Sequence, residues 1–96
     1  MKRIIYSFCM LSFMLAADKV FVVCEGNFGQ QDGQIWTIDN DQVYPYESNP
    51  IGSIAQSVAI YKNKLLVGVN SDYKVLIYNI SSSGLSYETE VLTDGL

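Results

Sequence analysis

Beyond residue 18, the apolar residues of this chain recur at the spacing of β-strands rather than of helices. Short runs rich in β-branched and aromatic residues alternate with polar turns built from Gly, Asn, Asp and Ser. No stretch in this part keeps a helical period over three turns. The pattern predicts strands at residues 20–24, 34–39, 43–47, 56–61, 65–69, 74–79 and 85–91.

Two of these strands carry the marks of a sheet edge. Pro45 has no backbone N–H to donate to a ladder, so the strand over 43–47 is predicted to be an edge strand. In the run 85–91, apolar residues alternate with Ser86, Glu88 and Glu90. One face of this last strand is therefore expected to be exposed to solvent, as in an outer strand of a sheet.

The strand pattern repeats along the chain. Val20–Cys24 falls on Leu65–Val69 at an offset of 45 residues, and Ile35–Asp39 falls on Val75–Asn79 at an offset of 40. A third match, of Val43 and Tyr44 on the neighbourhood of Tyr87, has an offset of about 43. A period of about 40–45 residues with four strands per unit is typical of the blades of a β-propeller. A chance meander within a small β-sandwich is the alternative.

The first 17 residues have the pattern of a leader. Met1-Lys2-Arg3 supplies a positive start, and a nearly unbroken apolar run extends from Ile4 to Ala17. We predict a secretory signal helix over residues 1–17, cut after Ala17 or Ala16. A membrane anchor is the alternative, but the run is shorter than the ~20 apolar residues that a spanning helix needs. The chain is therefore expected to be exported to the periplasm, the cell surface or the medium, with no stable membrane insertion after cleavage.

Composition narrows the possible chemistry. The 96 residues are 49% hydrophobic, contain no histidine and carry a net charge of −4. Ser-His-Asp and Cys-His catalysis are thereby excluded for this chain, and the commonest zinc ligand is missing. Nucleic-acid binding is not expected, because it needs clustered Lys and Arg. After cleavage, Cys24 would be the single cysteine, expected to be a buried apolar side chain without an internal disulfide.

Two stretches resemble a known family. The stretch Cys24-Glu25-Gly26-Asn27-Phe28-Gly29 resembles the loop after the first strand in exported, Bacteroidota-type, seven-bladed propellers of the YncE-like, surface-layer-protein-like group. Here Cys24 stands where that group has asparagine. The run from Gly52 to Leu65 is similar to the group's blade entry, with its Gln56 start and Asn63-Lys64-Leu65. The resemblance covers residues 20 to about 80.

The resemblance implies an all-β fragment of about two antiparallel four-stranded propeller blades behind a signal helix. Residues 18–96 would form the partial propeller, with blade one at 20–47 and blade two at 54–91. Blade one is expected to lack an inner strand before Val20. Because a closed ring takes about 4–8 blades, the remaining partners are expected to be missing blades or further copies of the chain.

Three loops are predicted to share one end of the strands, at residues 25–33, 48–55 and 70–73. Binding residues usually gather on such loops. Phe28 is predicted either to plug the core or to contact a ligand. The candidate ligand-binding residues are Asn27, Phe28, Gln30, Gln31, Gln56, Asn70, Asp72 and Tyr73, with ordinary turn roles as the alternative for each.

Catalytic and metal motifs are weak. Glu25 and Asp32 are two acids in one loop without a nucleophile, and Asp39-Asn40-Asp41 lacks the further ligands of a calcium loop. No catalytic residues, metal or cofactor are predicted. The leading hypothesis is a non-catalytic exported module that binds a small ligand or an envelope protein through its loop face. The alternatives are a fragment of a propeller enzyme, such as a lyase or quinoprotein-like oxidoreductase, and a structural envelope protein.

Overall fold

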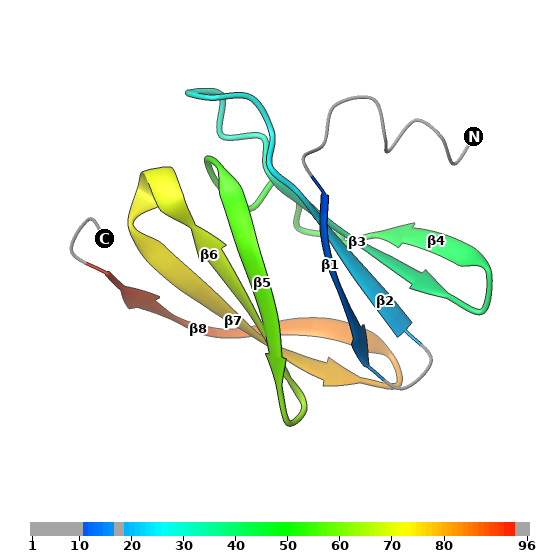
Figure 1. Ribbon diagram of the computed structural model, residues 1–96. Coiled ribbons are helices and arrows are strands. Elements are labelled where there is room, and N and C mark those ends of the chain that lie inside the picture. Colours follow the sequence, from blue (N-terminus) through cyan, green and yellow to red (C-terminus); the bar gives the residue numbers. More distant parts are fainter. Residues whose placement is uncertain (1–10, 17–18, 94–96) are drawn as a thin grey trace.

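A computed structural model of the chain describes residues 11–16 and 19–93, which form an all-β structure of antiparallel strands (Figure 1). Within this part the only helical element is a single 3₁₀ turn, η2 (Asn70–Asp72). The strands are β1 (Leu11–Ala16), β2 (Lys19–Cys24), β3 (Gln34–Asp39), β4 (Gln42–Pro45), β5 (Ala55–Tyr61), β6 (Lys64–Val69), β7 (Lys74–Ser81) and β8 (Gly84–Leu92).

The strands form two four-stranded sheets, in which neighbours in sequence are neighbours in space. Sheet 1 has the order β1-β2-β3-β4 and sheet 2 the order β5-β6-β7-β8. The predicted all-β class and antiparallel pairing are confirmed, and each strand expected from residue 20 onward is present within about two residues of its predicted bounds. The period-2 pattern succeeded because each inner strand must present one side-chain row to each face.

Strand β1 differs from the prediction. A signal helix was expected over residues 1–17, and blade one was expected to lack an inner strand. Instead, Leu11–Ala16 forms a strand that pairs with β2 from Leu11↔Cys24 to Ala16↔Lys19. The physical reason is that β2 would otherwise present an unpaired backbone edge, which an apolar segment just upstream can satisfy. Residues 1–10 and 17–18 lie outside the described residues, and these include Ala17, which takes part in both predicted cleavage bonds.

The two predicted edge strands lie where expected. β4 is the outer strand of sheet 1, and Pro45 is its last residue. Beyond it, the Asn49 side chain takes the place of a strand: its amide donates to the Ile35 carbonyl at 2.9 Å, and its Oδ1 accepts from the Ile35 N–H at 3.0 Å. β8 is the outer strand of sheet 2, and most of its residues are exposed.

The main core lies between the two sheets. Sheet 1 contributes Phe21, Val23 and Ile35, which are fully buried. The residues of sheet 2 that pack against them come from the start of β5, from alternate positions of β6 and from β7. They are Ala55, Leu65, Val67, Val69, Leu76 and Tyr78. The sheets therefore pack face to face through one apolar face each.

Cys24 is buried, as expected, with 5% of its surface exposed. It is also disulfide-bonded in the full chain, a bond that the expectation for the cleaved chain did not include. That expectation assumed that the leader and its cysteine had been removed. The bonding partner lies outside the described residues.

Candidate functional site

Three loops meet at one end of the two sheets, which we call the loop end. The loop between β2 and β3, the connection from β4 to β5, and η2 with Tyr73 all lie there (Figure 1). The opposite end, which we call the hairpin end, carries the short β3–β4, β5–β6 and β7–β8 turns. The predicted grouping of the loops therefore agrees with the structure.

Backbone hydrogen bonds connect the loops across the two sheets. Gly33 and Gly52 form an isolated antiparallel bridge, in which the Gly33 N–H donates to the Gly52 carbonyl at 2.8 Å. The Ile51 N–H donates to the Gly33 carbonyl, also at 2.8 Å. The Asn70 N–H donates to the Ile54 carbonyl at 2.9 Å. These bonds join the loops directly through their backbones.

Ser53 is the buried polar centre of this arrangement. Its Oγ accepts a hydrogen bond from the Gln31 N–H at 3.2 Å, and its own N–H donates to Asp72 Oδ2 at 3.0 Å. Its exposed fraction is 4%. One residue thus links all three loops. Sequence reasoning missed Ser53, because its importance comes from contacts with residues 22 positions before it and 19 after it.

The tip of the β2–β3 loop is held in a fixed turn. Asp32 accepts from the Asn27 N–H at 2.7 Å and from the Asn27 side-chain amide at 3.1 Å. The Gln30 N–H closes a turn onto the Asn27 carbonyl at 3.0 Å. Gly26 lies beneath Asp32 with φ +84°, and a Cβ there would lie 2.4 Å from Asp32 Oδ1. The Asp-Asn pair therefore fixes the loop from which Phe28 projects.

Phe28 projects into solvent with 85% of its surface exposed. Of the two roles expected for it, core plug or ligand contact, the first is wrong. The base of its loop is joined by backbone bonds to the β4–β5 connection, and Phe28 itself lies at the exposed tip of the loop.

The remaining predicted site residues lie at the same end. The Gln56 side chain donates to Glu25 at 3.1 Å, which ties β5 to the first loop. Asn70 is exposed, and Tyr73 follows it with a left-handed φ of 55° and 54% exposure. Asp72 is half-buried under Ser53. The structure thus brings all the predicted residues to one end, and it gives Asn27, Gln31 and Asp72 structural hydrogen bonds.

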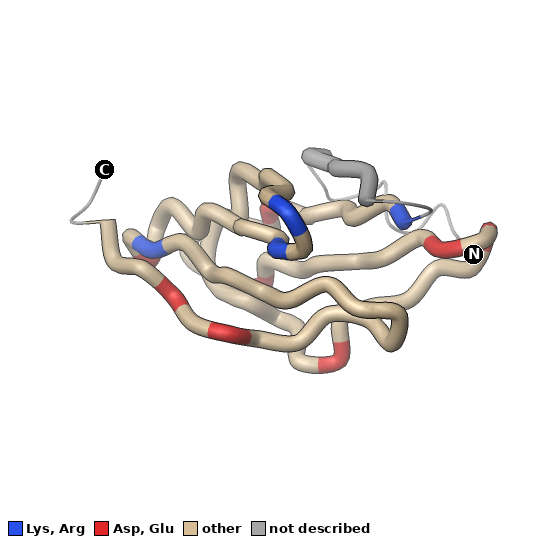
Figure 2. The backbone as a smooth tube through the Cα atoms, turned by 90° about the horizontal axis from the view of Figure 1, so that it is seen from below, with Lys and Arg blue, Asp and Glu red and all other residues tan. Residues whose placement is uncertain are grey.

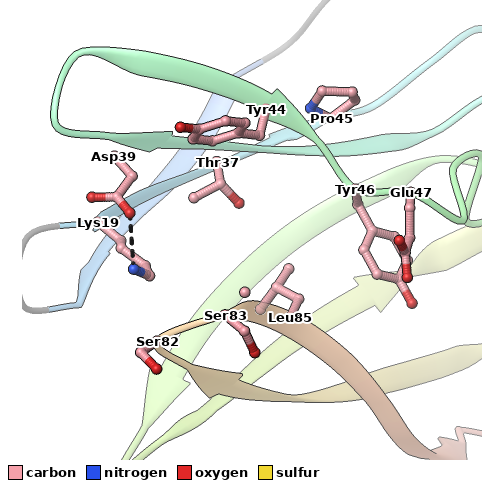
Figure 3. Close-up of a pocket in the computed structure, with 11 residues that line it drawn as sticks. Lys19, Thr37, Asp39, Tyr44, Pro45, Tyr46, Glu47, Ser82, Ser83 and Leu85 are labelled. Carbon is pink, nitrogen blue, oxygen red and sulfur yellow. Dashed lines mark hydrogen bonds and ion pairs between the residues drawn. The ribbon is translucent and has the colours of Figure 1, made fainter.

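A cavity of about 400 Å³ lies between the sheets toward the hairpin end (Figure 3). One wall carries Lys19 and Asp39, which form an ion pair at 3.0 Å. The other lining residues come from β3, from β4 and the segment after it, and from the β7–β8 turn with the start of β8: Thr37, Tyr44, Pro45, Tyr46, Glu47, Ser82, Ser83, Gly84 and Leu85. This cavity could not be predicted from the sequence, because no local pattern brings residues near 20, 45 and 83 together.

Three tyrosines in edge-to-face contact connect Tyr46 of the cavity lining to sheet 2. The rings of Tyr46 and Tyr78 meet edge to face at 5.2 Å between centroids, and those of Tyr78 and Tyr87 at 6.0 Å. Burial, followed by the neighbouring tyrosines and Glu90, raises the pKa of Tyr78 well above its ordinary value. Desolvation, followed by the Glu90 carboxylate that accepts its hydroxyl, also raises the pKa of Tyr87. Both side chains therefore stay neutral at physiological pH.

The acidic segment at residues 39–41 has a structural role at the β3–β4 turn. Asn40 and Asp41 have φ values of 53° and 67°, as the central residues of a type I′ hairpin require. Asp39 is engaged by Lys19. In the described part of the chain, no group of three or more His, Cys, Asp or Glu side chains is placed to hold a metal ion.

No family model, curated protein or solved structure matches this chain. Among the residues described by the structure, no helix is long and apolar enough to cross a membrane.

Proposed function

We propose that this chain is an exported, non-catalytic module of the β-propeller type that binds its partner through the loop end. The proposal joins three elements: the blade architecture, the export leader over residues 1–17, and a binding surface centred on Phe28.

The sheets support the blade architecture over a small sandwich. In a two-sheet sandwich, each sheet has one apolar face toward the core and one polar face toward water. Here the far face of sheet 1 carries a second apolar cluster, in which Val22 and Cys24 are surrounded by Val20, Trp36, Ile38 and Val43. Apolar residues on both faces of a sheet are typical of propeller blades, which have neighbours on both sides.

The exposure of Phe28 is the observation that carries the binding proposal. The exposed tyrosines place a hydroxyl in water, but Phe28 has no polar atom to solvate. Burying such a ring against a partner is worth about 1.5–3 kcal/mol. Because Asn27 and Asp32 already hold the loop in one conformation, little conformational entropy is lost on binding. An apolar ring on a pre-organised loop is typical of an interface anchor.

A photo-crosslinking experiment tests the proposal in the host envelope. Phe28 is replaced by the photo-reactive p-benzoylphenylalanine, and the matched control places the same residue at Tyr61, which is 65% exposed at the hairpin end. We expect discrete cross-linked products from position 28 that are missing from position 61. Identical products from both positions, or none from position 28, would overturn binding through the loop end.

A further inference from the structure

Each sheet has a second apolar face that is turned away from the core between them. On sheet 2, this outer face is read from the strand register: Ala59 pairs with Leu66, Leu66 with Ile77, and Ile77 with Thr89. A neighbouring row places Gly68 beside Val75 and Val75 beside Val91. Ala59 is exposed, and Leu66, Val75 and Ile77 are half-buried. These two rows contain no charged residue, and the next row toward the hairpin end holds Lys64, which forms an ion pair with Glu88 and donates to Asn79. Figure 2 marks the acidic and basic positions along the backbone.

The sequence repeat shows what this outer face corresponds to in sheet 1. At the offset of 45 residues between β2 and β6, Phe21 corresponds to Leu66. At the offset of 40 between β3 and β7, Thr37 corresponds to Ile77. Phe21 pairs with Thr37, and Leu66 pairs with Ile77, so the correspondence holds in the register as well as in the sequence. The outer face of sheet 2 is therefore equivalent to the inner face of sheet 1, which is covered by sheet 2.

The reverse correspondence holds for the outer face of sheet 1. Val22 corresponds to Val67 and Trp36 to Leu76 by the same offsets, and each pair is again in register. Val67 and Leu76 lie on the face of sheet 2 that is buried against sheet 1. The outer face of sheet 1 thus corresponds to the inner face of sheet 2, which packs on sheet 1 within this chain.

We propose that copies of this chain associate head to tail, with the outer face of sheet 2 on one copy packing on the outer face of sheet 1 on the next. The contact between copies would repeat the contact between sheets 1 and 2. A contact of this kind is heterologous and closes into a ring when its rotation permits. At two sheets per copy, a ring of about 4–8 blades holds two to four copies. This inference rests on the face correspondence and does not depend on any ligand at the loop end.

Two blocking variants test the geometry with the protein produced from the full chain. Ile77→Lys places a charge on the outer face of sheet 2, and Ile38→Lys places one on the outer face of sheet 1. Ser82→Lys, in the exposed β7–β8 turn, is the matched control. Native mass is measured by light scattering for each protein and for an equimolar mixture of the two blocking variants. Circular dichroism and the milder pair Ile77→Thr and Ile38→Thr exclude misfolding as the cause of any change.

Head-to-tail packing predicts a specific set of masses. The unmodified chain and Ser82→Lys should form a closed assembly of two to four copies, and each blocking variant alone should be monomeric. The mixture should form a 1:1 dimer, because each variant retains the face that the other lacks. A monomeric unmodified chain would overturn the proposal. So would a blocking variant that dimerises alone, since that outcome requires like faces to meet.

Discussion

The connection between loops at the loop end can be tested at Gly52. This residue has φ +144°, a backbone conformation that side-chain-bearing residues rarely adopt. A Cβ at this position would lie 2.6 Å from Asp72 Oδ2 and 2.8 Å from Val69 Cγ1. The Asp72 oxygen is the acceptor for the Ser53 N–H, so it cannot retreat without breaking that bond. Gly52→Ala should therefore strain the backbone and also disturb the contact that links the loops.

The two effects can be separated by a matched glycine. Backbone strain of this kind costs about 1–3 kcal/mol, and forcing an extra methyl into a packed site costs about another 1–3 kcal/mol. Gly84 has a similar φ of +124°, but a Cβ there meets nothing within 4 Å. Gly84→Ala should therefore show the strain alone. We expect Gly52→Ala to reduce the free energy of unfolding by about 1–3 kcal/mol more than Gly84→Ala does.

Urea unfolding followed by circular dichroism measures this difference. All variants are compared at one protein concentration, because the stability of an assembled protein depends on concentration. In an Asp72→Ala background, the excess cost of Gly52→Ala should fall, since one of the two close contacts is gone. Equal destabilisation by Gly52→Ala and Gly84→Ala, within about 0.5 kcal/mol, would refute a steric cost at Gly52.

Three further predictions concern other parts of the molecule. Burial raises the pKa of Tyr78 above the value of 10.0 that the unfolded chain keeps, so stability is fully present below pH 10 and lost as pH rises above it. Urea unfolding between pH 9 and 12 should show a loss of up to about 1.4 kcal/mol per pH unit from this residue, and Tyr78→Phe should remove that part of the slope. Asn49→Ala removes the acceptor of the N–H of the buried Ile35, whose carbonyl keeps the Tyr46 N–H, and should cost about 1–3 kcal/mol in the same assay, whereas Ser82→Ala at an exposed turn should cost almost nothing. Under reducing conditions, the intact mass of the exported protein should correspond to a chain starting at Asp18 or Ala17, in which sheet 1 would lack β1; a mass that includes Met1 would refute removal of the leader.

The strands and their order could be predicted from the sequence because their signals are local. Alternating side chains, the β-branched runs and the Asn-Asp and Lys-Asn turns each specify structure within a few residues. The offsets of 45 and 40 between the two halves even match the observed register, since Phe21 and Thr37 pair as Leu66 and Ile77 do. Pro45 correctly marked an edge, because a missing N–H has the same consequence in any sheet.

The features that could not be predicted depend on contacts between distant residues. Ser53 has an ordinary sequence neighbourhood, and its role exists only once Gln31 and Asp72 lie beside it. The cavity at the hairpin end likewise forms only when the sheets pack. The strand β1 was not predicted for another reason. An apolar run is suited both to a leader and to the inner position of a sheet, and periodicity does not distinguish these two roles.

The assembly and the binding surface are physically connected through the loop end. If copies pack as sheets 1 and 2 pack within one chain, every loop end faces the same side of the assembly. Each copy then contributes one Phe28 to that side, where the ring remains exposed. Several weak contacts on a rigid scaffold can hold a repetitive partner far more tightly than one contact can, by a factor of about 10²–10⁴. Monomeric Ile77→Lys should therefore still cross-link its partner through position 28 but release it much faster than the assembled chain does. Equal release rates from the two forms would show that each loop end acts alone.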